Sequence, residues 1–475
     1  MEANAMAISL NPSTLLSGQG INVSAVVQAI MSQSSGQLSG WQDEQTTLQL
    51  QASDLTGINS DLSNLASVVH ALADPLGALT SQSATSSDTA VLTASATSAA
   101  VAGTHQIVVS NLASAGLVYT NDFAAGANAS ILGSGVTGGE IDLQIGSASP
   151  VPIAITAGTN DTLTTLASYI NGQKLGVTAS VVSDANGSRL ALVSQSTGTA
   201  GALAITSNNT SLVFNPPSGG ANASLTIDGV PYSSASNTIS GAIPGVTLNL
   251  ASAAPNLPVQ LTVAANSIQI TQAINNFVAA YNQVIGDMNQ QYTVNAATDQ
   301  EGPLGSDSGL RAVQSSVLDA AAYSVSGNSG YVNLASLGIN TNNDGTLTVD
   351  SAQLNSVLSS NPSALQNFFQ NAANTGFANN FNTSLNYLTD LTTGPLAVDL
   401  KQNSAQQQDL TNSIQNLETQ LLAEQTQLTS QYNLVNASLQ AYPLLLQEVT
   451  ATLGTLGSGG GNSSSATAPT LTSGL

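Results

Sequence analysis

The chain is predicted to be an α+β multidomain protein, with a helical coiled-coil stem built from both termini and β-rich domains inserted in the middle. Apolar residues recur in steps of three and four near both ends of the sequence, which is the spacing of a coiled-coil seam. The middle instead carries short alternating segments that meet at Asn-Gly and Asp-Gly turns. At roughly 150 residues per domain, 475 residues are enough for about three domains.

The first apolar row lies in the N-terminal part of the chain. Its positions follow a heptad pattern, and they are Leu55, Ile58, Leu62, Leu65, Val69, Leu72 and Leu76. The pattern continues less regularly upstream through Leu38, Trp41 and Leu48. We therefore expect a long helix, which Pro75 should stop or kink near its end.

A second apolar row lies near the C-terminus. It has the same spacing, and it consists of Leu428, Tyr432, Val435, Leu439, Tyr442, Leu446, Val449 and Leu453. Pro443 interrupts this row and predicts a kink or a break in the helix. Residues 457–475 are rich in Gly, Ser and Thr, and we expect them to form a disordered tail.

These two rows are expected to cover each other. One helix alone cannot bury a heptad row, and each Leu left in water forgoes about 2 kcal/mol of burial. Pairing the two terminal helices solves this problem and makes the middle of the chain an insertion. The alternative is two unrelated helical domains.

The middle of the chain has the patterns of β-hairpins. Alternating residues from Val177 to Val181 lead to Asn186-Gly187, and Leu225–Ile227 leads to Asp228-Gly229. Both dipeptides supply the positive φ angles of tight hairpin turns. Pro231 restricts the strand that follows the second turn to an edge position or a short piece.

Other segments of the middle predict a helix and the passages between domains. Asn160-Asp161 ahead of Leu163 indicates a capped helix. Two stretches rich in Gly or Pro, Gly126–Gly139 and Pro216–Gly220, are candidate crossings between domains. Helix returns with the broad apolar face that runs from Ile268 to Ile285.

The charge composition excludes several functions. The chain has 26 acidic and 4 basic residues, a formal net charge of −22, so it cannot neutralise the phosphates of a nucleic acid. An anionic membrane surface is excluded for the same reason. No segment reaches the roughly 18 apolar residues that span a membrane, and Met1–Pro12 lacks the features of a cleaved signal peptide. The composition predicts a surface or extracellular protein that uses a dedicated export route.

The sequence offers little for catalysis or for metal binding. Cysteine is absent, and the two histidines, His70 and His105, are interpreted as structural residues. The segment from Asn340 to Gly345 resembles part of a calcium loop, but Ser351 stands where the bidentate carboxylate is required. We interpret the segment as a turn, with Asp350 as the N-cap of the next helix. We expect no catalytic residue, cofactor or metal, and therefore no enzyme.

Read in order, the motifs resemble those of the flagellar filament cap proteins, the hook-associated protein two family. Members open with a pattern similar to Ser17–Asn22, in which Gly20 replaces the usual Asp. His105 replaces the usual Tyr in Ala102–Val109. Further matches are Ser86–Asp88, Val91–Ala96, Leu163–Asn171, Arg189–Leu192, Thr226–Gly229, Pro244–Leu250, Phe277–Asn282, Gly302–Leu304, Leu337–Ile339, Asp344–Leu347 and Asn361-Pro362 with Phe368-Phe369. Each motif alone is common, and their shared order over nearly the whole chain carries the resemblance.

The resemblance implies a division into stem, leg and head. The stem would comprise residues 1–48 and 400–456, and a helical or mixed leg domain would comprise 49–80 and 266–399. A first β-rich head domain would comprise 81–125 and 222–265, and a second would comprise 126–221.

The resemblance also implies an assembly function. Such a protein caps the tip of the bacterial flagellar filament, retains exported flagellin and promotes its polymerisation. It is expected to form a ring with further copies of itself, and the expected ring is a pentamer. Its other expected partners are flagellin, the hook–filament junction proteins and a cytoplasmic export chaperone, with no nucleic acid and no membrane insertion. It would be extracellular and exported without a cleaved signal. The alternatives are another axial flagellar component or a secreted adhesin that binds host glycans.

We expect the oligomer or filament interface to lie on the terminal helices. Its candidate residues are Ile21, Val23, Val27, Ile30, Leu428, Val435, Leu439, Leu446 and Val449. Charged residues are scarce there, so packing and side-chain amides must specify the interface.

Overall fold

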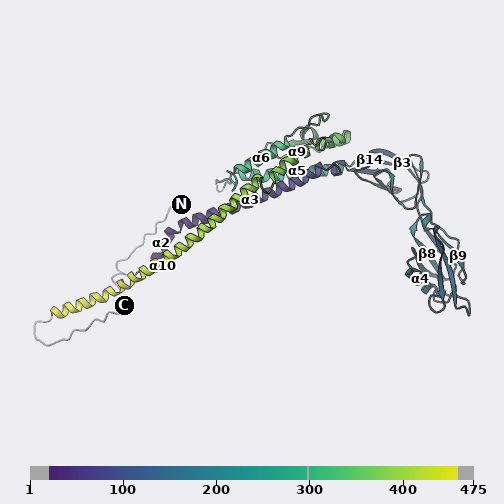
Figure 1. The fold of residues 1–475 in the computed structure, drawn as a ribbon, viewed down its shortest axis with the longest axis horizontal. Helices are drawn as coiled ribbons and strands as arrows, with labels where there is room; N and C mark the ends of the chain where they lie inside the picture. The colour runs from purple at the N-terminus through teal and green to yellow at the C-terminus, as the bar shows by residue number, and fades with distance from the viewer. Residues whose placement is uncertain (1–20, 297–298, 372, 458–475) are drawn as a thin grey trace. The chain divides into compact units, whose positions relative to one another are not determined.

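The computed structural model describes residues 21–296, 299–371 and 373–457. It divides into two compact units, each assembled from separate pieces of the chain (Figure 1). Unit 1 contains the described residues up to Ser63, together with Val284–Ser316 and the chain from Asn386 onward. Unit 2 contains Asn64–Gln283 and Val317–Leu385. The division into four domains expected from the resemblance stays a prediction.

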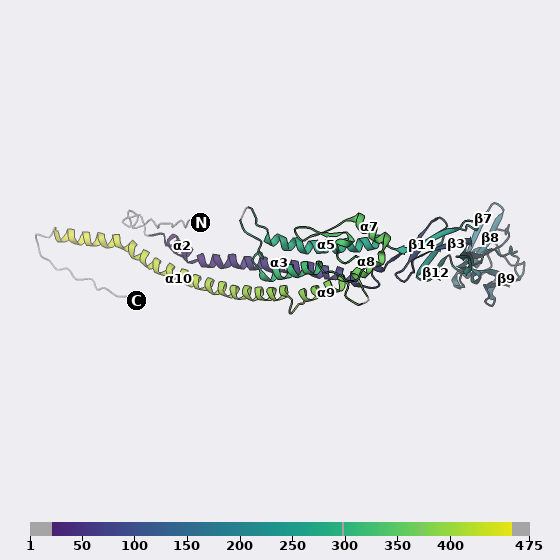
Figure 2. The same cartoon turned by 90° about the horizontal axis from the view of Figure 1, so that it is seen from above.

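Unit 1 is helical. Its elements are α2 (Val23–Ser34), the first part of α3 (Gly36–Ala73), the end of α5 (Ser267–Tyr292), the start of α6 (Ser308–Ala321) and α10 (Pro395–Gly457). Asn22 caps α2, because its side chain accepts a hydrogen bond from the Ala25 N–H. Both views show α2 alongside α10 (Figures 1 and 2), and the two helices are in contact. The helical stem built from both chain ends is therefore confirmed.

The first predicted heptad row is buried for six of its seven members. Leu55, Ile58, Leu62, Leu65, Val69 and Leu72 are at most 2% exposed. The seventh, Leu76, is 77% exposed, so its assignment to the row was wrong. The reason is Pro75: the residue before a proline disfavours the helical conformation, and α3 ends at Ala73, before Leu76 can lie on its face.

Helix α10 is continuous over 63 residues and contains Pro443. Pro443 therefore does not break the helix, which was one of the two outcomes predicted for it. A proline inside a helix loses one backbone hydrogen bond, and the long helical segments on either side hold the chain helical across that gap. The predicted tail lies outside the described residues beyond Gly457, and so do Ser17–Gly20 of the opening motif.

The helical part of unit 2 packs around a core of aromatic side chains. Its further elements are α7 (Ser351–Ser360), α8 (Pro362–Phe369), most of α9 (Phe377–Leu388), the 3-10 turns η1 (Ala78–Thr80) and η3 (Ala335–Leu337), and the hairpin β15 (Ile339–Thr341) and β16 (Leu347–Val349). Six rings are fully buried together: Phe277, Tyr281, Phe368, Phe369, Phe377 and Phe381. Phe377 stacks on Phe368 at 5.2 Å and meets Phe277 edge-on at 5.8 Å, both favourable aromatic geometries.

Two antiparallel sheets form the first β-domain. The five-stranded sheet has the order β1-β14-β3-β10-β11, and the three-stranded sheet has the order β12-β13-β2. The bounds are β1 Gln82–Ser86, β2 Leu92–Ala96, β3 Gly103–Asn111, β10 Ala223–Ile227, β11 Val230–Ser234, β12 Thr238–Ile243, β13 Val246–Leu250 and β14 Val259–Ala265. Alternate apolar residues of both sheets share one core, which includes Ile107, Leu248 and Leu261.

The second β-domain packs helix α4 (Leu163–Gly172) and two three-stranded sheets around another core. The sheet orders are β4-β8-β7 and β6-β5-β9. The bounds are β4 Ala115–Tyr119, β5 Gly138–Ile145, β6 Val151–Thr156, β7 Val177–Asp184, β8 Gly187–Thr197, followed by the 3-10 turn η2 (Thr199–Gly201), and β9 Leu203–Asn208. The core includes Leu143, Leu166 and Leu192, all at most 1% exposed.

Both predicted hairpins form. Asp228 and Gly229 have φ angles of +51° and +83° and connect β10 to β11, whose Pro231 lies on the sheet edge as expected. In the other hairpin, Asp184 pairs with Gly187, so the turn residues are Ala185 and Asn186. The predicted turn is therefore one residue too far along the chain.

The helix predicted after Asn160-Asp161 is α4, but its cap is a different residue. Thr162 accepts the Thr165 N–H and forms a capping box with it. Asn160 instead holds the preceding strand end, since its amide bonds both the Thr156 N–H and the Ala154 C=O. The composition around the helix start does not separate these two roles.

Three further expectations can be compared with the structure. The chain passes from the first β core to the second between Ala113 and Val118, upstream of the Gly126–Gly139 stretch. Ile268 was expected on the buried face of α5 but is 81% exposed, because it lies in the first turn of the helix, before the packed part begins. Asp350 caps α7 as predicted and accepts the Ala352 and Gln353 N–H groups.

Candidate assembly surface

The start of the stem is fixed by α2 against α10. Val26 and Val27 are the buried residues of α2, at 8% and 3% exposure. The Ile21 N–H donates a hydrogen bond of 2.7 Å to Asn436 Oδ1, so the chain entering α2 is tied to the C-terminal half of α10. Apolar packing and one amide therefore set the position of α2 along α10.

Side-chain amides join α3 to α10. The Leu48 C=O accepts hydrogen bonds from Asn403 Nδ2 at 3.0 Å and from Gln407 Nε2 at 3.3 Å. Gln45 Nε2 donates to Thr411 Oγ1 at 2.9 Å. Asn403 is only 6% exposed, so its amide contributes to a buried contact. Within the chain, side-chain amides therefore take the place of ion pairs between α3 and α10, and the expectation that packing and amides specify the assembly interface stays a prediction.

The C-terminal half of α10 carries apolar side chains that no other described residue covers. They are Leu434, Val435, Tyr442, Leu444, Leu445, Leu446, Val449 and Leu453, each between 47% and 71% exposed. We call these eight residues the open row. Between Leu428 and Thr455, Glu448 is the single charged residue. A contiguous exposed apolar patch of this kind marks an interaction surface.

The structure places the nine predicted interface residues in three environments. Val27 is buried within the chain. Half-buried are Ile21, Val23, Ile30, Leu428 and Leu439. The open row contains Val435, Leu446 and Val449. Five members of the open row were not among the predicted interface residues. Tyr442 and Leu453 lie on the heptad row but were not selected from it. Leu434, Leu444 and Leu445 lie off that row, because the apolar side chains extend around the helix.

Two carboxyl pairs lie inside unit 1. Burial, together with the hydrogen bond and the charge of Asp287, raises the pKa of Asp61 to about 6. Burial and the charge of Asp307 also raise the pKa of Asp399. Asp307 caps α6 by accepting the Leu310 N–H at 2.8 Å. Of these carboxyls, Asp61 is the one whose raised pKa of about 6 lies close to neutrality.

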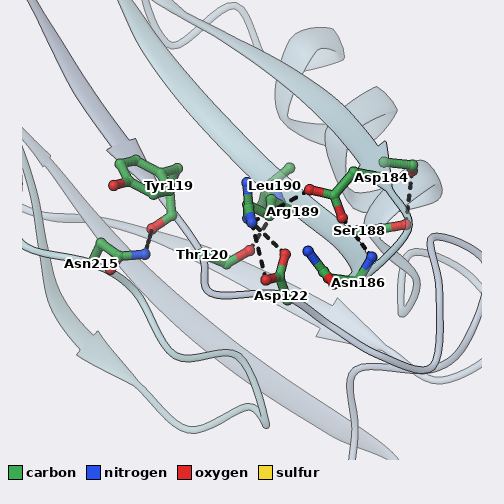
Figure 3. Close-up of polar contacts among 10 residues, drawn as sticks. Tyr119, Thr120, Asp122, Asp184, Asn186, Ser188, Arg189, Leu190 and Asn215 are labelled. Carbon is green, nitrogen blue, oxygen red and sulfur yellow. Dashed lines mark hydrogen bonds and ion pairs between the residues drawn. The ribbon is translucent and has the colours of Figure 1, made fainter.

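Arg189 of the second β-domain forms a local ion-pair cluster with two carboxylates. Arg189 Nε lies 2.7 Å from Asp122 Oδ1, and Arg189 Nη2 lies 3.5 Å from Asp184 Oδ2 (Figure 3). Asp122 thereby raises the pKa of Arg189. The buried Thr120 hydroxyl beside this pair accepts the Leu190 N–H at 2.9 Å. The interactions hold β8 against the 119–123 segment, which explains the cluster without a ligand.

His105 also has a structural partner. Its Nδ1 lies 2.7 Å from Asp228 Oδ2, across the β3–β10 pair, and the pair lowers the pKa of Asp228. Among the described residues, no cluster of His, Asp and Glu has an arrangement suited to a metal ion. Within the same part of the chain, no helix combines the length and apolarity needed to cross a bilayer.

A stem made from both chain ends, with an open apolar row and β-domains inserted between its halves, defines a multidomain assembly protein. The sequence comparisons agree with this class. A model of the flagellar hook-associated protein 2 C-terminus matches residues 220–442, and one of its N-terminus matches residues 19–116. A flagellin hook IN motif matches residues 134–196, within the second β-domain. The chain belongs to the flagellar hook-associated protein 2 family.

Similar proteins cover most of the chain. The B-type flagellar hook-associated protein 2 of Pseudomonas aeruginosa is 29% identical over 416 residues, which are 80% of this chain and 84% of that protein. The flagellar hook-associated protein 2 of Escherichia coli is 28% identical over 377 residues, 74% of this chain and 79% of that protein. The crystal structure of the D1-D2-D3 domains of the Escherichia coli flagellar cap protein FliD superposes with a TM-score of 0.56 at 27% identity, covering 74% of this chain and 99% of that one.

Proposed function

We propose that this chain caps the distal tip of the bacterial flagellar filament, where it prevents the loss of exported flagellin and promotes its polymerisation. The observation that carries this is the likeness, over 74% of the chain, to the domains of a flagellar cap protein. Models of both ends of one family match in the expected order, which favours the cap over another axial component or a glycan-binding adhesin. The function is an assembly function and involves no chemical step.

A deletion strain of the source organism tests the proposal. Filaments should be lost and monomeric flagellin should appear in the medium, because nothing would retain exported subunits at the tip. Re-expression of the gene should restore filaments and clear the medium. Normal filaments in the deletion strain would refute the cap function.

The protein acts as a ring of identical copies, and we place the ring contacts on the terminal helices. The open row supports this, since its apolar surface is unsuited to permanent exposure. The candidate contacts are Ile21, Val23, Val27, Ile30, Leu428, Val435, Leu439, Leu446 and Val449. A pentamer is the proposed ring size, taken from the resemblance alone.

The ring contact can be tested with Leu439→Asn and Leu446→Asn. Each change places an amide in the apolar seam, and together they should abolish assembly while the β-domains stay folded. Light scattering gives the oligomer mass and circular dichroism gives the fold. Val182→Asn is the matched control, since Val182 is a 54% exposed apolar residue in a β-domain. An unchanged oligomer mass in the double variant would refute this placement.

Two further kinds of partner and the export route belong to the same proposal. A cytoplasmic chaperone covers the C-terminal part of α10 before export, because an open apolar row invites aggregation. The hook–filament junction proteins contact the cap before the filament grows. The protein reaches the cell exterior without a cleaved signal. A pull-down with residues 395–457 as bait that recovers no such chaperone would count against the first of these.

A further inference from the structure

A cleft separates two edge strands of the first β-domain. It has a volume of about 630 Å³, and it is lined by Gln82, Ser83 and Ala84 of β1 and by Ala94, Ser95 and Ala96 of β2. The segment before β1 and the start of α5 complete the wall, with Leu76 and Gln269 among their residues. Strands β1 and β2 pack near each other but belong to different sheets, where each is the last strand.

The unused backbone groups of β1 point toward the open side of its sheet. The Asn266 N–H donates to the Ser81 C=O at 2.9 Å, and the Ser87 N–H donates to the Gln260 C=O at 2.8 Å. These bonds show that the odd-numbered residues of β1 are the ones whose backbone groups hydrogen-bond to β14, since such bonds involve alternate residues along an antiparallel strand. The N–H and C=O groups of Gln82 and Ala84 therefore face away from β14.

The same alternation holds for β2. The Thr97 N–H donates to the Gly245 C=O at 2.9 Å, and the Ala251 N–H donates to the Val91 C=O at 2.8 Å. The backbone N–H and C=O groups of the odd-numbered residues of β2 therefore point toward β13, and those of Ala94 and Ala96 point away from it. Each side of the cleft is therefore formed by a strand whose outer backbone N–H and C=O groups are not used by its own sheet.

The other sheet edges of the two β-domains are blocked or interrupted, whereas these two are not. The edge strands β9 and β12 are each interrupted by a β-bulge, where their pairing with β5 and with β13 shifts register. β6 contains Pro152, and β11 contains Pro231. The edge of β7 is closed by Asn171, whose amide bonds the N–H and the C=O of Ala179. β4 is covered by bridges from Phe214 and Ser218. β1 and β2 contain neither proline nor a charged residue. Because proteins block edges that would otherwise pair with other chains, two bare edges on one cleft indicate a binding function.

The chemistry of the cleft selects a neutral strand. Among the described residues, no charged side chain lines the cleft, so a charged side chain of the bound segment would lose hydration there without gaining an ion-pair partner. The lining side chains beside the strands are Ala and Ser, which leave room for backbone. The buried Gln82 Oε1 has no hydrogen-bond partner in the described part of the chain and can accept an N–H. Leu76, 77% exposed, offers apolar contact at the rim.

We propose that the cleft between β1 and β2 binds an extended, uncharged segment of polypeptide with small side chains, by strand addition to one or both edges. The backbone of the bound segment would use the groups of Gln82, Ala84, Ala94 and Ala96. This strand-binding site does not depend on the capping function, and its test uses purified protein alone.

The test measures binding of a fluorescent, acetylated and amidated peptide of alternating Thr and Ala to the full chain by anisotropy. The peptide should bind, and a version with alternate amides N-methylated should not, since methylation removes the donors that a strand needs. Hydrogen exchange at Gln82, Ala84, Ala94 and Ala96 should slow when the unmethylated peptide is added.

Two variants complete the test. Ala84→Pro removes an N–H that β14 does not use, and Ala94→Lys puts a charge in the cleft; each should weaken binding by about tenfold or more. Val230→Lys, at an exposed position of the already blocked β11, should leave binding unchanged. Circular dichroism verifies that all three fold.

Four outcomes would overturn the proposal. They are no binding of the peptide at millimolar concentration, equal binding of the methylated peptide, and unchanged binding by both cleft variants. The fourth is a lower oligomer mass of either cleft variant without peptide, because a second copy of the chain would then occupy the cleft.

Discussion

At the scale of single residues, Asp61 makes the stability of unit 1 depend on pH. Its pKa is raised from 3.8 to about 6, chiefly by burial and then by Asp287. A carboxyl whose pKa is higher in the folded state is favoured in its protonated form by folding. Its stabilising contribution is complete below its unfolded pKa, near 4, and is lost as the pH rises through about 6.

Unit 1 should therefore unfold more easily at pH 7.5 than at pH 5, and Asp61→Asn should reduce this difference. Asn is neutral at every pH and can still donate a hydrogen bond to Asp287. Thermal unfolding followed by helical circular dichroism at both pH values measures the effect. Asp43→Asn, at an exposed position of the same helix, is the control. A midpoint in Asp61→Asn with the same pH dependence as the parent would contradict the assignment.

The aromatic core of unit 2 gives a second prediction at this scale. Phe377 is fully buried and contacts four other rings, Phe277, Phe368, Phe369 and Phe381. Phe377→Ala should cost about 3–5 kcal/mol of the free energy of unfolding, because it leaves a cavity that packed neighbours cannot fill. Tyr387→Ala, 60% exposed in the same helix, should cost less than about 1 kcal/mol. Urea unfolding of both variants distinguishes the two.

At the scale of elements, the stem is aligned by amides. Asn403→Ala removes the shorter of the two hydrogen bonds to the Leu48 C=O and should lower the stability of unit 1 by about 1–2 kcal/mol. Ser404→Ala, at the exposed neighbouring position, should be close to neutral. Helical circular dichroism in urea gives the comparison. If both variants unfold at the same urea concentration, the amide does not stabilise the stem.

The sequence predicted the elements better than their ends and their partners. The heptad row from Leu55 to Leu72 and the Asp228-Gly229 turn depend on local spacing, and the structure confirms both. The heptad spacing alone placed Leu76 on the row, whereas Pro75 ends α3 before that residue. Asp61 and Asp287 are 226 residues apart, and their contact exists only through the packing of α3 on α5. No local sequence pattern predicts a contact between two such distant residues.

The candidate sites show the same limit. Heptad spacing located part of the open row, but the exposed fraction of each residue depends on which face α2 covers. The cleft between β1 and β2 was not predicted at all. It arises because two strands that are close in sequence join different sheets, and hydrogen-bond partners of strands are long-range properties.

At the scale of the whole molecule, net charge opposes assembly while the open row favours it. Each copy carries −22, and the copies repel one another over the Debye length. That length is about 30 Å at 0.01 M salt and about 8 Å at 0.15 M salt. The contact itself contains little charge, since Glu448 is the single charged residue between Leu428 and Thr455. The long-range repulsion is therefore screened by salt, whereas the contact is not weakened by it.

Self-association should accordingly strengthen between 0.01 and 0.15 M NaCl, and then change by less than about twofold up to 0.5 M. Sedimentation velocity over a concentration series at each salt concentration measures the dissociation constant. The Leu439→Asn, Leu446→Asn variant should stay monomeric throughout, which separates screening of repulsion from nonspecific salting-out. An association that weakens steadily with salt would mean that ion pairs between copies hold the ring, and the contact would then have to be sought at the few basic residues, Lys174, Arg189, Arg311 and Lys401, instead of on α10.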